Sequence, residues 1–197
     1  FIIGSAATLD KALALIGSNL STQELPDINA TSSHGKIGVV VPYIDTDLSD
    51  LPYGQVSPRA GAAAVAWASA AGHLAMNNDV DAIVTAPISK EAARMAGHED
   101  FGHQEIYQHL AGVPRVLTML LTKGLRVVHL TTHHPLSNAS VHVTTERDLE
   151  ALQLTHSFFE SHGLAHPRIG GAALNPHNGE AGLIGSEEIE QISPAVQ

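Results

Sequence analysis

The sequence predicts an α/β protein with a mixed sheet. Short apolar runs typical of strands alternate with helical stretches along the chain. Several helical stretches start or end at residues typical of helix caps. Two apolar runs are joined by only three residues, 122–124, too few for a crossover helix, so those strands should pair antiparallel. With 197 residues, 44% of them apolar, the chain is long enough to bury a hydrophobic core.

The first half should begin with the end of a strand at 1–4 and a short helix over 8–17. The next stretch is rich in Asn, Ser, Thr and Asp and is predicted to be a loop. An apolar strand over 37–41 follows. Ser57 and Pro58 are typical of a helix start, and the Ala-rich run that follows predicts a buried helix to about Met76.

The rest of the chain repeats this alternation. After a strand over 80–85, a short helix over 89–96 should end at Gly97, whose achiral backbone suits a helix C-terminus. The remaining expected elements are a helix over 103–110, a hairpin of 116–121 and 125–131, an amphipathic helix over 145–162, a strand over 168–174 and a helix over 186–197.

Composition excludes several classes of protein. The chain has 20 acidic and 10 basic residues, a net charge of −10, and no Lys/Arg run, which argues against nucleic-acid binding. It lacks a membrane-length apolar stretch and a signal-peptide pattern. The absence of cysteine excludes disulfides, thiolate metal sites and a thiol nucleophile, and favours a cytoplasmic setting. Both termini look cut, so we expect a fragment of a longer protein.

Histidine is unusually common, with thirteen residues against ten Lys and Arg together. His133 and His177 follow predicted strands, and His103 lies after a glycine turn. The carboxyl ends of strands are where α/β sheets place ligands, and two imidazoles plus a third ligand would form an open metal site. If His133 and His177 share one ion, their ring nitrogens should lie about 3–4.5 Å apart. The alternative, that each is a surface or hydrogen-bonding residue, stays open.

Lys90 should stand at the start of a helix, next to the positive end of the helix dipole. A lysine there suits an anionic partner, such as a substrate carboxylate or phosphate. A surface lysine that points into water is the competing interpretation. The chain has no P-loop, no strand followed by GxGxxG and no GxSxG serine motif.

Four motifs occur in order along the second part of the chain. They are Thr85-Ala86-Pro87-Ile88-Ser89-Lys90, Gly102-His103-x-Glu105, Thr131-Thr132-His133-x-Pro135-Leu136, and Leu174-Asn175-Pro176-His177-x-Gly179-Glu180 with Gly185-x-Glu187-Glu188-Ile189. Together they resemble the 4-hydroxythreonine-4-phosphate dehydrogenase family and its relatives, which act on sugar-acid phosphates or dihydrodiol carboxylates. The resemblance is good from about Ser57 to the end and weak before it.

The resemblance implies a two-domain fold like those of isocitrate and isopropylmalate dehydrogenases, here truncated at both ends. We expect a first α/β domain over 1–97 and a second over 98–197 that carries the metal histidines. Such enzymes bind NAD or NADP without the Rossmann glycine motif. The family holds a divalent metal (Zn, Mg, Co or Mn) with three histidines, of which His133 and His177 match the first two. The third should lie beyond Gln197, in a site shared between the subunits of a homodimer.

The resemblance also implies a reaction, within pyridoxine biosynthesis or a related pathway. The metal would favour ionisation of a secondary hydroxyl while hydride leaves for the nicotinamide, with loss of CO₂ if the product is a β-keto acid. His103 would contact the substrate, and Lys90 would act at the catalytic centre by binding an anionic group. Gln104 stands where the family has Thr. The expected substrate is a small anionic hydroxy acid, and whether it is phosphorylated, as 4-phosphohydroxy-L-threonine is, stays open.

Two other functions stay open on the sequence. One is a metal-dependent hydrolase in which Glu105 or Glu180 serves as general base. The other is a non-catalytic, oligomerising or ligand-binding fragment, suggested only by the ends of the chain.

Overall fold

The computed structural model describes residues 1–42, 48–100, 102–132 and 134–197. These form two compact units, Phe1–Val116 and Leu117–Gln197. The domain boundary expected between 97 and 98 stays a prediction. Within unit 1, the helix that follows this boundary, 103–111, packs into the hydrophobic core. Within the described ranges, no helix combines the length and apolar character needed to cross a bilayer.

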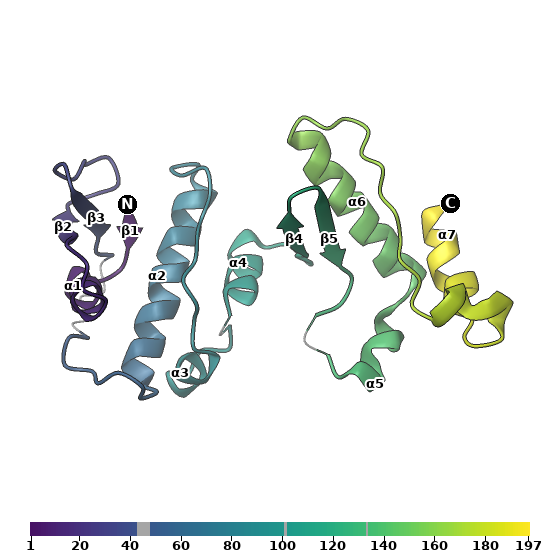
Figure 1. Ribbon diagram of the computed structural model, residues 1–197, viewed down its shortest axis with the longest axis horizontal. Coiled ribbons are helices and arrows are strands. Elements are labelled where there is room, and N and C mark those ends of the chain that lie inside the picture. The colour runs from purple at the N-terminus through teal and green to yellow at the C-terminus, as the bar shows by residue number, and fades with distance from the viewer. Residues whose placement is uncertain (43–47, 101, 133) are drawn as a thin grey trace. The chain divides into compact units, whose positions relative to one another are not determined.

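Unit 1 begins with a small parallel sheet. Its strand order is β1-β3-β2, with every pairing parallel, and the strands are β1 (Ile2–Ile3), β2 (Ser21–Leu25) and β3 (Lys36–Val40). The helix α1 (Ala6–Leu15) connects β1 to β2 and starts at Ser5, whose Oγ accepts a hydrogen bond from the Thr8 N–H. Figure 1 shows these elements at the N-terminal end. Val39 of the central strand is fully buried.

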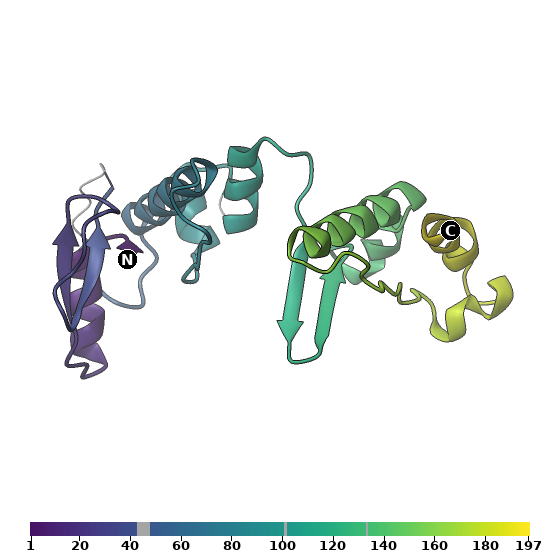
Figure 2. The same ribbon diagram turned by 90° about the horizontal axis from the view of Figure 1, so that it is seen from above.

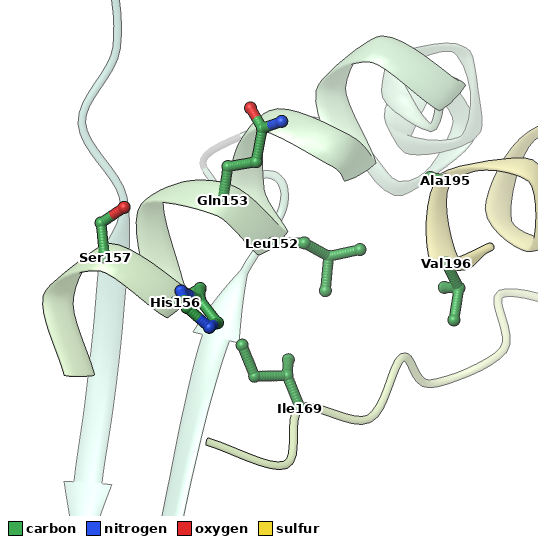
Figure 3. A pocket seen from close by; sticks show the side chains of 7 residues that line it. All are labelled: Leu152, Gln153, His156, Ser157, Ile169, Ala195 and Val196. Atoms are coloured by element: carbon green, nitrogen blue, oxygen red, sulfur yellow. The ribbon is translucent and has the colours of Figure 1, made fainter. Parts of the chain in front are cut away.

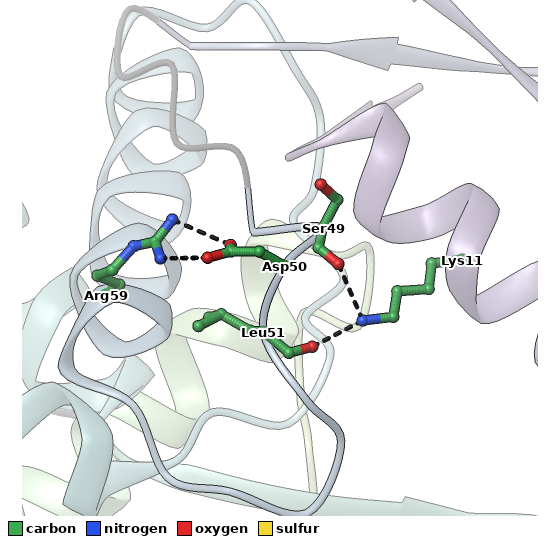
Figure 4. A network of polar contacts seen from close by, with 5 residues as sticks. All are labelled: Lys11, Ser49, Asp50, Leu51 and Arg59. Atoms are coloured by element: carbon green, nitrogen blue, oxygen red, sulfur yellow. Dashed lines mark hydrogen bonds and ion pairs between the residues drawn. The ribbon is translucent and has the colours of Figure 1, made fainter.

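A polar network joins α1 to the chain before the next helix (Figure 4). The Lys11 Nζ donates to the backbone carbonyls of Ser49 (3.1 Å) and Leu51 (2.6 Å). Arg59 donates through its two terminal guanidinium nitrogens, Nη1 and Nη2, to the Asp50 carboxylate, at 2.8 and 3.2 Å. These charge-assisted hydrogen bonds hold the segment 49–51 between two helices.

Three helices complete unit 1: α2 (Pro58–Met76), α3 (Lys90–Met95) and α4 (His103–Ala111). Small residues let α2 and α3 approach closely: a Cβ on Gly61 would overlap the Ala92 carbonyl and lie 2.6 Å from the Ala93 nitrogen. A core cluster from all three helices fixes α3 and α4 on α2; its members are Val65, Ala68, Ala93 and Ile106.

Unit 2 starts with the predicted antiparallel hairpin of β4 (Thr118–Thr122) and β5 (Leu125–His129). The long helix α6 (Thr145–Ser161) lies beside it (Figures 1 and 2), with the Arg126 guanidinium 5.8 Å from the Phe159 ring centre. The remaining elements are α5 (Leu136–Ala139), the 3₁₀ turns η1 (Ser140–His142) and η2 (Pro176–Gly182), the π-helical turn η3 (Glu188–Ile192) and α7 (Ser193–Val196).

The structure confirms the α/β class and corrects three details of the prediction. The described strands form two separate sheets, one parallel and one antiparallel, rather than one mixed sheet. The stretch predicted as a loop before β3 contains β2. The runs 80–85 and 168–174 are not strands, because no described strand pairs with them. The helix expected over 186–197 is confirmed; its first part, η3, is π-helical and runs directly into the short α7.

Candidate active site

The N-terminal ends of α3 and α4 bring together most of the residues proposed to contact substrate. Ser89 begins α3, and its Oγ accepts a hydrogen bond from the Ala92 N–H (3.2 Å). Gly102 begins α4 without a side-chain cap. A Cβ there would overlap the Glu105 carboxylate and lie 3.0 Å from Lys90 Nζ, so the glycine leaves room for both groups.

Lys90 and Glu105 form an ion pair across this junction. The Lys90 Nζ lies 3.3 Å from Glu105 Oε1, and the two side chains are 47% and 43% exposed. The Glu105 carboxylate therefore supplies, within the chain, the anionic partner expected for a lysine at this position. An ion pair this exposed contributes about 1 kcal/mol or less to stability, so a bound anion could replace Glu105 with only a small loss of free energy.

His103 and Gln104 occupy the first turn of α4, next to this pair, and both are partly buried. The His103 ring centre lies 6.1 Å from that of Tyr107, with the planes tilted by 31°. Burial raises the pKa of the Tyr107 hydroxyl. Within the described chain that hydroxyl has no hydrogen-bond partner. Tyr107 thus carries a buried hydroxyl without a described partner, on a ring that packs against the core of unit 1.

His133 lies outside the described residues, so its predicted distance from His177 stays a prediction. Its neighbour His134 stacks on His142, with ring centres 4.0 Å apart. Burial lowers the pKa of His142, and the charges of His134 and Arg147 add to this effect. No functional role was predicted for either of these stacked histidines.

His177 lies on a left-handed turn, η2. The φ angles from His177 to Ala181 are +52°, +57°, +75°, +49° and +55°, so consecutive residues occupy the left-handed region. The segment before it is not a strand, and the reason given for His177, a position at a strand end, was therefore wrong. Its side chain is exposed, which leaves the imidazole accessible to a ligand.

Two glutamates hold this turn from the start of η3. Glu188 is only 2% exposed. Its carboxylate accepts hydrogen bonds from the Asn175 backbone N–H (2.5 Å) and side-chain amide (3.0 Å), and that amide also donates to Glu187 (2.7 Å). The hydrogen bonds from the Asn175 side chain and backbone lower the pKa of Glu188 and outweigh the opposing effect of burial. Both glutamates belong to the motif that follows His177 in the sequence, but no role in holding the turn was predicted for them.

The described residues do not by themselves assemble a metal centre. Among them, no group of three or more His, Asp or Glu side chains could hold an ion. His177 nevertheless suits one position of such a centre, because its imidazole is exposed on a turn whose backbone is fixed by the Glu188 contacts. The companion ligand predicted from the sequence is His133.

A shallow cavity of about 350 Å³ lies elsewhere in unit 2 (Figure 3). Leu152, Ile169 and Val196 point into it from α6, the segment before η2 and α7. Gln153, His156, Ser157 and Ala195 complete its lining. None of the candidate residues contributes to it, so the cavity plays no part in the proposed site.

Comparison with known proteins gives a family for the whole chain. The model of the pyridoxal phosphate biosynthetic protein PdxA family matches residues 1–197. The 4-hydroxythreonine-4-phosphate dehydrogenase of Geobacter metallireducens is 36% identical over 99% of this chain and 58% of its own length. The D-threonate 4-phosphate dehydrogenase of Cupriavidus necator is 38% identical over 100% of this chain and 59% of its own length.

A solved structure agrees with these matches. The 4-hydroxythreonine-4-phosphate dehydrogenase of Klebsiella pneumoniae has a TM-score of 0.89 and 35% identity, over 98% of this chain and 59% of that one. The chain thus spans somewhat under two thirds of the relatives it matches. Because the family model covers the full chain and the motifs at Lys90, His103 and His177 lie within it, the chain belongs to the PdxA family.

Proposed function

We propose that the protein is an NAD(P)-dependent dehydrogenase that oxidises the secondary alcohol of a small phosphorylated β-hydroxy acid. The substrate resembles 4-phosphohydroxy-L-threonine, and oxidation is coupled to decarboxylation. The observation that carries this proposal is the family match over residues 1–197, with relatives named for dehydrogenation of 4-hydroxythreonine 4-phosphate and D-threonate 4-phosphate.

The junction of α3 and α4 supplies the substrate contacts. Lys90 binds the anionic group of the substrate, which displaces Glu105 from the ammonium group 3.3 Å away. Displacement separates one exposed ion pair and forms another, so the exchange is nearly balanced in free energy. His103 and Gln104 line the same end of α4 and orient the substrate. The longer Gln104 side chain adds an amide that a Thr would lack, and this tunes the choice of hydroxy acid.

His133 and His177 are the proposed metal ligands, with a third histidine completing the set. A divalent ion, Zn, Mg, Co or Mn, supplies Lewis acidity that favours loss of the hydroxyl proton and polarises the ketone. The chain itself must present both imidazoles in neutral form and hold their rings in place. We propose that the active protein is a homodimer in which the two subunits share this site.

The finer features of the fold follow from the same family membership. We propose that the complete protein has the two-domain arrangement of isocitrate and isopropylmalate dehydrogenases, with the nicotinamide cofactor, NAD or NADP, bound without a Rossmann glycine motif. The absence of cysteine supports a cytoplasmic location.

The test is a reduction assay on the full-length protein that carries this sequence. We expect NAD⁺ or NADP⁺ to be reduced with 4-phosphohydroxy-L-threonine or D-threonate 4-phosphate, and EDTA to abolish turnover. Lys90→Met should raise KM for the phosphorylated substrates at least 10-fold. Lys123→Met, which removes a lysine from the β4–β5 turn, is the matched control and should leave KM unchanged. Turnover without any nicotinamide reduction would refute the proposal and favour the hydrolase.

A further inference from the structure

The turn that carries His177 needs support from outside itself. His177, Asn178, Glu180 and Ala181 all have positive φ, a region that costs a non-glycine residue about 1–2 kcal/mol each. A run of such residues persists only where the surroundings impose it. The surroundings in question are Asn175 before the turn and Glu188 packed against it.

The packing between the turn and the glutamates leaves no free space. A Cβ on Gly179 would lie 2.9 Å from Glu188 Oε2 and 2.7 Å from the Gly185 carbonyl oxygen. A Cβ on Gly185 would lie 2.6 Å from the Asn175 Cγ and 2.8 Å from Glu187 Oε2. The turn therefore packs closely against the Glu188 carboxylate at Gly179, and Glu187 packs against Gly185 just after the turn.

The chemistry of Glu188 suits it to this contact. An ionised carboxylate only accepts hydrogen bonds, and both the backbone and the side-chain N–H groups of Asn175 donate to it. In the described part of the chain no Lys, Arg or His forms a salt bridge with Glu188, so these N–H groups provide the compensation that a buried charge requires. A Gln side chain of the same shape would direct an NH₂ group at a donor.

We propose that Glu188 is a positioning residue whose carboxylate, acting through Asn175 and Gly179, imposes the left-handed turn that presents the His177 imidazole to its ligand. This inference rests on the proposed function, in which His177 binds the metal. Glu188 itself is only 2% exposed, and its carboxylate is hydrogen-bonded to Asn175.

Co²⁺ is the probe for the first experiment, because its visible absorption reports the ligand set. Metal-free full-length protein is titrated with Co²⁺ in wild type, Glu188→Gln, Glu188→Asp and Glu190→Gln. Glu190 is an exposed glutamate of the same turn of helix and serves as the control. We expect Glu188→Gln to weaken Co²⁺ binding about 10–100-fold, the range typical of residues behind a metal ligand. Glu188→Asp should recover part of the affinity, and Glu190→Gln should retain all of it.

A glycine pair tests the contact without changing any charge. Gly179→Ala and Gly182→Ala both place a Cβ at positive φ, +75° and +93°, so both carry a similar backbone penalty. Only the first Cβ meets Glu188 and the Gly185 carbonyl, whereas the second meets just the Ile189 Cδ1 at 3.7 Å. Gly179→Ala should weaken Co²⁺ binding at least 10-fold more than Gly182→Ala. Equal effects of the two would contradict the proposal.

A second readout does not depend on the metal. The backbone amide resonances of Asn175 and of residues 177–182, together with the His177 ring resonances, should move in Glu188→Gln and stay in place in Glu190→Gln. If His177→Ala abolishes Co²⁺ binding and Glu188→Gln leaves both binding and resonances unchanged, the inference is overturned. If His177→Ala binds Co²⁺ normally, the metal assignment fails instead, and the resonances alone decide the role of Glu188. Should Glu188→Gln not fold, Glu188→Asp and Gly179→Ala give the same decision.

Discussion

Replacing Gly61 with alanine should separate two helices and thereby disturb the end of α3 that holds Lys90. The new Cβ would overlap the Ala92 carbonyl and lie 2.6 Å from the Ala93 nitrogen. Both atoms are backbone, so no side-chain rotation relieves the overlap, and α2 and α3 must move apart. Ala93, which is fully buried, would then lose part of its contact with Val65.

Two opposing contributions, overpacking and helix propensity, set the change in the free energy of unfolding. Overpacking a core costs about 1–3 kcal/mol, and a backbone clash belongs at the upper end. Alanine gains about 1 kcal/mol over glycine in a helix interior, which offsets part of the cost. The net loss is about 2 kcal/mol, equivalent to a fall in Tm of about 4–8 °C for a chain of this size.

Gly72→Ala on the same helix is the matched control. Its Cβ would meet the Leu110 Cδ1 at 2.5 Å and the Tyr107 ring at 3.3 Å, which are side-chain atoms that can move. The same gain in helix propensity should then make it nearly neutral, within about 1 kcal/mol. Thermal and urea unfolding followed by circular dichroism measure both variants. A Gly61→Ala protein as stable as wild type, or a Gly72→Ala protein that loses more, would refute the packing argument.

Three further outcomes follow from individual side chains. Because the folded-state pKa of Glu188 lies below its ordinary 4.5, its contribution to stability is present above that pH and is lost as the pH falls through the folded value. The urea midpoint of wild type should therefore converge on that of Glu188→Gln as the pH is lowered, and a constant difference would contradict this. His142 has a folded pKa below its ordinary 6.5, so its neutral form is favoured and stability should decline as the pH drops below 6.5. His142→Phe keeps an aromatic ring against His134 and should show a smaller decline in the same titration. Lys11→Met removes the hydrogen bonds to the Ser49 and Leu51 carbonyls and should cost about 1–2 kcal/mol in urea unfolding, with Lys123→Met near zero as the control.

Local signals in the sequence were enough to predict the longer helices and the hairpin. Ser89 was predicted to start a helix, and its side chain caps α3 in the structure. The three-residue link at 122–124 predicted the antiparallel pairing of β4 and β5. In each case the decisive interaction lies within a few residues along the chain, so it is visible in sequence order.

The sheets show where local signals fail. The polar sequence Ser21–Leu25 has little strand character, yet it forms β2 because β3 offers it a parallel partner. Conversely, the apolar run 80–85 was predicted as a strand, but it has no partner among the described residues and Val84 is 97% exposed. Strand formation depends on a second segment to complete the backbone hydrogen bonds.

The candidate site also has features that the sequence predicted and features that only the tertiary structure revealed. The motifs that contain Lys90, His103 and His177 are each contiguous in the sequence. They could therefore be recognised there, together with the family that they resemble. Only the tertiary structure paired Lys90 with Glu105 and buried Glu188 beneath the turn of His177. Those contacts join residues that are distant in sequence, and the free energy of such contacts depends on burial and geometry that no linear pattern contains.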